Sequence, residues 1–123
     1  MKKPLALSLL VLASACRSDS IVPIDCPEIA RPGISLIALD RATAEPVRVK
    51  GTLVVREGSF AETATNAPPV ELTFYAAYER PGTYTVTLEI PGYETWRLDG
   101  VVVNANKCSV NTVPLAAQIS KSG

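Results

Sequence analysis

Apolar and polar residues alternate along most of the chain after residue 30, and this period of two is typical of half-buried β-strands. The segment 83–90 alternates without a break, and four apolar side chains fall on one face: Tyr84, Val86, Leu88 and Ile90. Three threonines and Glu89 fall on the other face. Residues 34–39 are almost wholly apolar, which predicts a central strand covered on both faces.

Three further segments show the same alternation. Their expected inward faces are Val49, Gly51, Leu53 and Val55; Val70, Leu72, Phe74, Ala76 and Tyr78; and Trp96 and Leu98, after which a bulge at Gly100 leads into Val101–Val103. Pro-Gly pairs at 81–82 and 91–92 predict type II turns, and no segment after residue 15 sustains helical spacing. The pattern predicts an all-β domain folded as a small β-sandwich.

The first fifteen residues have a different character. Lys2 and Lys3 precede Pro4–Ala15, an uncharged stretch rich in leucine and alanine. A basic start, an apolar run and small residues at its end are typical of a secretory signal peptide. The run is well short of the roughly 20 residues that a transmembrane helix needs. We therefore expect a cleaved signal rather than a permanent membrane span.

The sequence Ala13-Ser14-Ala15-Cys16 resembles the bacterial lipobox, in which cleavage precedes a cysteine whose thiol carries a diacylglycerol. The resemblance implies lipid attachment at Cys16 and membrane anchoring through that lipid. Arg17 stands where lipoproteins kept in the inner membrane often have aspartate, so the resemblance favours the outer membrane or cell surface. The alternative is ordinary cleavage after Ala15, which would leave Cys16 as a free thiol.

The cysteine count bears on the same question. The chain has three cysteines, and an odd cysteine in an exported protein asks for an explanation. Lipid on Cys16 would account for one and leave Cys26 and Cys108, 82 positions apart, as a pair. In an oxidising compartment, that pair predicts a disulfide bracketing nearly the whole domain.

Length and composition bound the remaining possibilities. Removing the signal leaves about a hundred residues, enough for one domain. We expect a signal at 1–15, a lipidated N-terminus and tether at 16–25, the domain at 26–119 and a tail at 120–123. Without Lys2 and Lys3, ten basic residues face twelve acidic ones with no basic patch, so nucleic acid is not an expected partner. The chain has no histidine, which excludes Ser-His-Asp and Cys-His catalysis and histidine-ligated metal sites.

Two regions resemble the carboxypeptidase regulatory-like domain family. Residues 32–47 resemble its first strand and turn, and Arg80–Val86 followed by Pro91-Gly92-Tyr93 resembles its tyrosine-bearing strand and Pro-Gly-Tyr turn. The resemblance spans roughly Pro32–Leu115 and implies a seven-stranded Greek-key β-sandwich of the transthyretin-like kind, without catalytic residues. One enzyme of related fold, hydroxyisourate hydrolase, depends on histidines, so its activity is excluded.

Ala44 departs from the family pattern, because a glycine commonly follows the threonine of that turn. Alanine resists positive φ, so we expect a turn of a different type there.

Several side chains have a structural interpretation. We expect Tyr84 in the core with its hydroxyl bonded to the backbone, Tyr93 folded back over one end of the sandwich, Trp96 facing inward and Arg80 capping a turn. Three sets are weighed as sites: an aromatic platform of Tyr75, Tyr93 and Trp96; oxygen ligands for calcium at Asp99, Asn104 and Asn106; and acid–base carboxylates at Glu57, Glu62 and Glu71. Core packing explains the aromatic set more simply, solvated turns explain the calcium set, and solvent-exposed strand faces explain the glutamates. We therefore expect no catalytic residue, cofactor or metal site.

The sequence thus favours a non-enzymatic, membrane-anchored lipoprotein of the cell envelope. Its sandwich would act as a binding or structural module, with an envelope protein or a glycan as partner and the ligand itself unknown. One alternative is a carbohydrate-binding module at the cell surface. The other is a carboxylate-dependent hydrolase, which would require paired acidic side chains that converge in a cleft.

Overall fold

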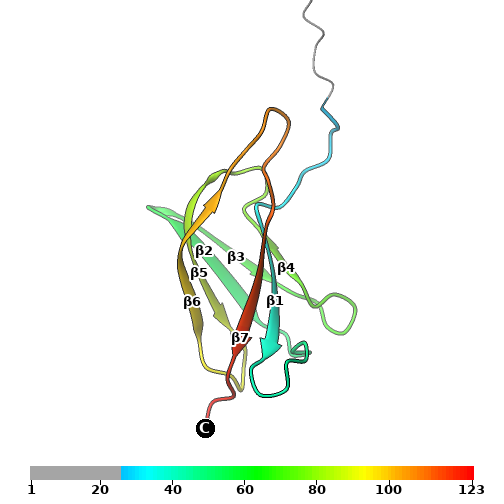
Figure 1. The fold of residues 1–123 in the computed structure, drawn as a ribbon, viewed down its shortest axis with the longest axis vertical. Coiled ribbons are helices and arrows are strands. Elements are labelled where there is room, and N and C mark those ends of the chain that lie inside the picture. Colours follow the sequence, from blue (N-terminus) through cyan, green and yellow to red (C-terminus); the bar gives the residue numbers. More distant parts are fainter. Residues whose placement is uncertain (1–25) are drawn as a thin grey trace, which may run out of the picture.

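Seven strands form two facing sheets in the computed structural model, which describes residues 26–123. The strands are β1 (Ile34–Asp40), β2 (Thr52–Glu57), β3 (Phe60–Thr65), β4 (Phe74–Ala76), β5 (Gly82–Glu89), β6 (Trp96–Val103) and β7 (Val113–Ile119). One sheet has the order β4-β1-β7 and the other β3-β2-β5-β6 (Figure 1). The expectation of an all-β sandwich is confirmed. Among the described residues, no helix is long and apolar enough to cross a membrane.

The core lies between the sheets and is built from the inward faces of the alternating strands. Tyr84, Val86, Leu88 and Ile90 are all at most 3% exposed, as the unbroken alternation of 83–90 predicted. Leu53 and Val55 of β2 and Phe74 and Ala76 of β4 are also buried. The Tyr84 hydroxyl donates to the carbonyl of Arg80 at 2.6 Å, which confirms the expected backbone partner.

The β-bulge expected at Gly100 is confirmed. Tyr84 pairs with Val101 while Val86 pairs with Leu98, so β6 has one residue more than β5 across this step. Gly100 supplies the left-handed φ of 72°. The extra residue shifts the alternation, and Val101 and Val103 therefore face the core while Val102 is 51% exposed.

Three residues that the alternation placed on inward faces are exposed instead. Val49 is 42% exposed, because β2 begins only at Thr52. Val70 is 91% exposed in a turn where its amide and that of Glu71 both donate to the Ala67 carbonyl. Leu98 is 39% exposed although it pairs with buried Val86, because β6 is the edge strand of its sheet.

The alternation also breaks directly after β4. Ala77 has a φ of 58°, which buries its own side chain and leaves Tyr78 48% exposed, the reverse of the expected order. The turn follows at once, since the Arg80 amide donates to the Ala77 carbonyl at 3.2 Å. Gly82 therefore opens β5 without a positive φ, and the type II turn expected at 81–82 is wrong. The one at 91–92 is supported by Gly92, whose φ is 88°, and by the bond from the Tyr93 amide to the Ile90 carbonyl.

Strand β1 is central, as expected, but it is not covered on both faces. Its inward residues Ile34, Leu36 and Ala38 are fully buried, while Ser35, Ile37 and Leu39 on the outer face are half-buried. No second layer covers that outer face among residues 26–123, since the two sheets pack only through their inner faces.

The turn after β1 has a left-handed residue at Ala44, although alanine disfavours that conformation. Ala44 has a φ of 64°, in the left-handed region, and its amide donates to the Asp40 carbonyl at 2.7 Å. The expected change of turn type is therefore wrong. Hydrogen bonds from the Ala42 and Thr43 amides to the Asp40 carboxylate hold the turn tightly enough to impose the unfavourable φ on an alanine.

Candidate functional site

Three segments meet at one end of the sandwich, which we call the lower pole. They are the β1–β2 turn at 40–45, the β5–β6 turn at 90–95 and the last residues, 120–122 (Figure 1). The loop between β6 and β7 lies at the other end, the upper pole, with the disulfide between Cys26 and Cys108. Their Cα atoms are 5.2 Å apart, and the pairing expected from the cysteine count is confirmed.

Asp40 organises the lower pole. It ends β1 facing inward, and only 7% of its surface is exposed. Its Oδ1 accepts hydrogen bonds from the amides of Ala42 at 2.8 Å and Thr43 at 3.2 Å, which closes the turn. Its Oδ2 accepts the Tyr93 hydroxyl at 2.8 Å, which ties the turn to the opposite sheet.

Tyr93 folds back over the end of the sandwich, as expected. Its ring is partly buried against the core, and its strand bridge to Lys121 brings the chain's last residues alongside. The Glu94 amide donates to the Ser120 carbonyl, and the Ser122 amide to the Gly92 carbonyl. The tail expected from residue 120 is therefore bonded to the β5–β6 turn as far as residue 122.

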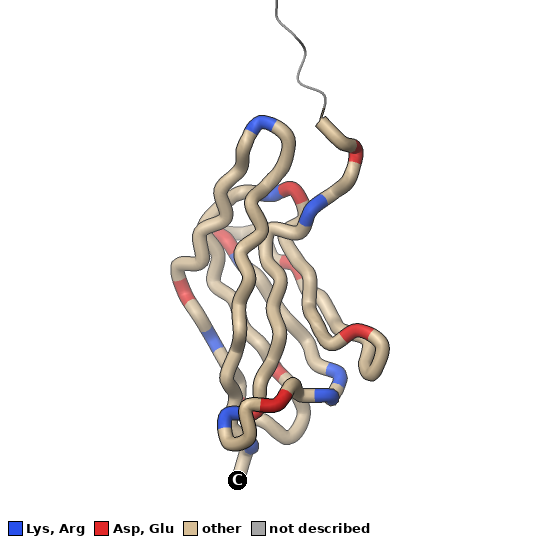
Figure 2. The backbone as a smooth tube through the Cα atoms, turned by 45° about the vertical axis from the view of Figure 1, so that its right-hand side comes forward, with Lys and Arg blue, Asp and Glu red and all other residues tan. Residues whose placement is uncertain are grey.

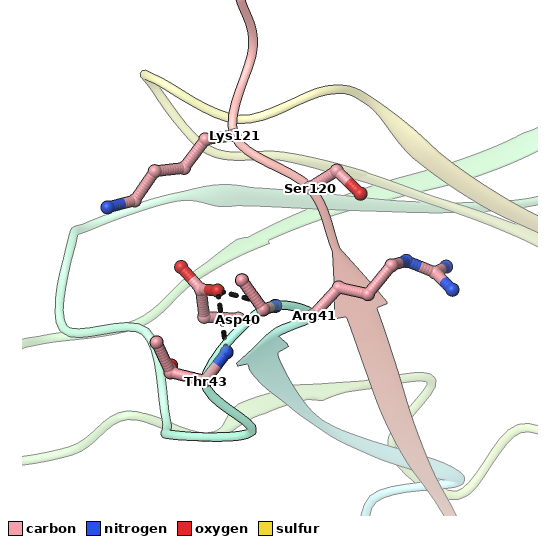
Figure 3. Close-up of a pocket in the computed structure, with 6 residues that line it drawn as sticks. Asp40, Arg41, Thr43, Ser120 and Lys121 are labelled. Atoms are coloured by element: carbon pink, nitrogen blue, oxygen red, sulfur yellow. Dashed lines mark hydrogen bonds between the residues drawn. The ribbon is translucent and has the colours of Figure 1, made fainter.

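A hollow of about 260 Å³ opens between the β1–β2 turn and these last residues. It is lined by Asp40, Arg41, Ala42, Thr43, Ser120 and Lys121 (Figure 3). Arg41 donates through Nη2 to the Gln118 carbonyl at 3.1 Å, and the Lys121 side chain extends over the turn from the other side. A second, more open hollow of about 370 Å³ lies beside Tyr93, between Thr52, Glu89 and Thr95. The lower pole therefore presents two cations beside a concave surface.

Asp40 and Tyr93 shift each other's pKa in opposite directions. The Tyr93 phenol, then the amides of Ala42 and Thr43 and the charge of Lys121, lower the pKa of Asp40 below its ordinary value. The bond to Asp40, aided by burial and the neighbouring negative charge, raises the pKa of Tyr93. At neutral pH the carboxylate is ionised and the phenol neutral, so neither is tuned to exchange a proton. This arrangement suits binding rather than acid–base catalysis.

The three glutamates considered for acid–base work each have a separate structural partner. Glu57 accepts from the Thr83 amide at 2.7 Å, Glu62 from the Ala77 amide at 2.9 Å and Glu71 from the Thr73 amide at 3.1 Å. The Glu62 bond joins the edge strand β3 to the chain just beyond β4 in the other sheet. Backbone amides hold these three carboxylates, which therefore link residues within a turn or between separate strands.

Two of the three calcium candidates have their side chains engaged in local bonds. Asp99 pairs with Arg97 at 3.0 Å beside the bulge, and Asn106 accepts the amides of Cys108 and Ser109 in the β6–β7 loop. The backbone carbonyl of Asn104 accepts a hydrogen bond from the backbone amide of Asn111. Within residues 26–123, no group of three or more cysteine, aspartate or glutamate side chains is arranged to hold a metal ion.

The aromatic candidates do not form one platform. Tyr75 pairs with Ser35 near the start of β1, whereas Tyr93 bonds to Asp40 at its end. Five residues of extended strand separate these positions, which is about 17 Å. Trp96 begins β6 and is partly buried against the core.

One cluster escaped the sequence analysis. The Arg80 guanidinium lies 3.7 Å from the centre of the Phe60 ring and bonds to Glu57 at 2.8 Å and to the Tyr84 hydroxyl at 2.9 Å. The bonds to the Thr83 amide and to Arg80 lower the pKa of Glu57. Glu57 pairs with Phe60 across the β2–β3 hairpin, but no local pattern in the sequence places Arg80 over them. The cluster fastens the β2–β3 hairpin to the start of β5.

No protein-family model matches the chain, and no curated protein matches it at a significant level of similarity. Cys16, with the expected signal and tether, lies outside the described residues.

Proposed function

We propose that the chain is an exported, lipid-anchored lipoprotein of the cell envelope, with its lipid on Cys16 and its sandwich acting as a non-enzymatic binding or structural module. The outer membrane is the proposed location. The lipobox-like residues before Cys16 support this, and so does the Cys26–Cys108 disulfide, a bond characteristic of proteins outside the cytoplasm.

The proposal depends on the two poles lying at opposite ends of the sandwich. The disulfide holds the first described residues at the upper pole, while both lower-pole hollows open at the other end of the strands (Figure 1). Strands of seven residues separate the poles by about 23 Å. A domain tethered through residues 16–25 would therefore hold both lower-pole hollows away from the membrane, while a further hollow of about 470 Å³ beside Cys108 would lie at the tethered end.

The nature of the lower pole supports binding over catalysis. The Asp40 carboxylate accepts hydrogen bonds from two amides and one phenol, and the Arg41 and Lys121 side chains line the hollow beside it. Such a rigid surface can select a partner by shape and charge without chemical change.

The anchor is tested by labelling growing cells with a palmitate analogue and separating their membranes. Cys16→Ser should abolish labelling and release the protein from the membrane fraction, whereas Cys26→Ser should still be labelled. Continued membrane retention of an unlabelled Cys16→Ser protein would contradict lipid anchoring.

The binding role is tested with intact envelopes. Cross-linking should yield a defined adduct with the native protein, and the double variant Arg41→Ser/Lys121→Ser should weaken it. Arg31→Ser/Lys107→Ser, two exposed cations at the upper pole, is the matched control. Equal adducts from all three proteins, or turnover of envelope glycans or peptides by the purified protein, would contradict the proposal.

Membership of the carboxypeptidase regulatory-like family is part of the same proposal. Seven strands divided three and four between two sheets support it, as does a Pro-Gly-Tyr turn at 91–93 whose tyrosine closes one end of the sandwich. An alignment of relatives that keeps the 80–86 and 91–93 residues would support the family. Relatives lacking both would contradict it.

A further inference from the structure

The outer face of the sheet β4-β1-β7 carries no charged residue. The strand registers define its rungs: Tyr75, Ser35 and Pro114; Ile37 and Ala116; and Leu39 with Gln118, joined by Pro46 through a single bridge. Tyr75, Pro114, Ala116 and Gln118 are exposed and the other four are half-buried. We call these eight residues the neutral face.

The other sheet has a different outer surface. Its outward residues include Arg56 on β2, Glu89 on β5 and the Arg97–Asp99 pair on β6, among several threonines. Figure 2 shows the two adjacent strands at the centre without blue or red along their length, and charges only toward their ends. Because the same domain bears charges on its other outer face, the neutral face is a property of one sheet rather than of the whole surface.

The dimensions of the neutral face argue against a protein partner. Three strands about 4.8 Å apart and about 23 Å long cover at most roughly 300 Å². A stable protein–protein interface needs about 800 Å² on each partner. A second copy of the chain stacked on this face alone would bury too little surface to remain associated.

We propose that the neutral face binds an uncharged polysaccharide chain, which goes beyond the binding role proposed for the lower pole and uses a separate surface. A sugar ring presents flat C–H surfaces to apolar groups and hydroxyls at its edges. Tyr75, Pro114 and Pro46 offer rigid apolar surfaces of the matching kind, because their rings lose little conformational entropy on binding. Ser35 and Gln118 offer hydroxyl and amide groups to the sugar hydroxyls.

The absence of charge sets the specificity. An acidic polysaccharide would lose hydration from its carboxylates along the middle of this face, where no side chain is charged, because the exposed cations Arg41 and Arg48 lie only at its border. A neutral polysaccharide has no carboxylates whose hydration would be lost. The elongated shape, along β1 from Tyr75 to Leu39, fits a few consecutive sugar units rather than a single monosaccharide.

The test uses the purified protein from residue 16 onward with Cys16→Ser, so that it is independent of the anchor. Affinity electrophoresis through gels containing mannan, xyloglucan or mixed-linkage β-glucan should retard the protein in at least one, and polygalacturonate should not. Tyr75→Ala should weaken the association about five- to tenfold. Tyr78→Ala is the matched control, because Tyr78 is more exposed and lies outside the neutral face.

A second pair of variants tests the role of neutrality. Ala116→Lys, which places a cation in the middle rung, should abolish retardation, whereas Thr87→Lys on the outer face of the other sheet should not. The proposal is overturned by the absence of retardation in every neutral gel, by equal effects within either pair, or by Tyr75-dependent dimers in sedimentation velocity. Such a failure leaves the labelling and cross-linking results of the proposed function unaffected.

Discussion

The Tyr93 hydroxyl donates a 2.8 Å hydrogen bond to Oδ2 of Asp40, 53 positions earlier in the chain. Asp40 ends a strand of one sheet, and Tyr93 follows a strand of the other. Because Oδ1 of the same carboxylate also holds two amides of the β1–β2 turn, one side chain shapes the turn and links the two sheets. The hollow at the lower pole depends on this arrangement.

This carboxylate should make stability depend on pH. The pKa of Asp40 is lower in the folded protein than its ordinary value of 3.8, so the stabilisation is complete above that value and is lost as the pH falls through the lowered pKa. Asp40→Asn should therefore be less stable than the native protein at pH 7, and the difference should shrink toward pH 3. Thermal unfolding across this range measures it.

Two controls accompany that experiment. Tyr93→Phe removes only the inter-sheet bond, so it should lower the melting temperature at pH 7 by less than Asp40→Asn. Glu57→Gln, in the Arg80 cluster, should show its own acid-dependent difference, since the pKa of Glu57 is also lowered. A pH-independent difference between Asp40→Asn and the native protein would contradict the assigned role.

The disulfide should contribute strongly to stability. The bond closes a loop of 82 positions, and on the chain-entropy account its removal costs about 4–5 kcal/mol of unfolding free energy. We expect Cys26→Ser/Cys108→Ser to show this loss in chemical denaturation, and Cys16→Ser to show none. Non-reducing mass spectrometry of the native protein should find the pair two protons lighter than the free thiols.

Ala44 should be a site where glycine improves the protein. Its φ of 64° is unfavourable for alanine, so Ala44→Gly should raise the unfolding free energy by about 1 kcal/mol. Ala42 lies in the same turn with an ordinary negative φ, and Ala42→Gly should lower it by about 0.5–1 kcal/mol. Chemical denaturation of both variants provides the comparison. Destabilisation by both would contradict the left-handed conformation at Ala44.

Val70 and Phe74 should respond in opposite ways, although the alternation placed both on one inward face. Val70 is 91% exposed, so Val70→Lys should change the unfolding free energy by no more than about 0.5 kcal/mol. Phe74 is fully buried, and Phe74→Ala should cost about 3–5 kcal/mol. A large loss from Val70→Lys would show that the 67–71 turn packs against something in solution.

Local rules predicted the fold well where strands are long and regular. The unbroken alternation of 83–90 placed Tyr84, Val86 and Leu88 correctly in the core, and Gly100 marked the bulge. Alternation failed where the strand ends before its pattern does. Val70 and Tyr78 continue an apolar period, but turns at 67–71 and 77–80 break the strand on both sides of Phe74–Ala76.

The sequence by itself determined the β class and the inward residues of the regular strands, because both follow from a period of two. It also indicated the pairing of Cys26 with Cys108, once the lipobox resemblance set Cys16 aside. The tertiary structure decided which distant groups meet. The Asp40–Tyr93 bond, the Arg80 stack on Phe60 and the neutral face joining β4, β1 and β7 all depend on how strands pair and sheets pack. Even the left-handed Ala44 was imposed against its local preference, because the hydrogen bonds of the folded turn outweigh the preference of one residue.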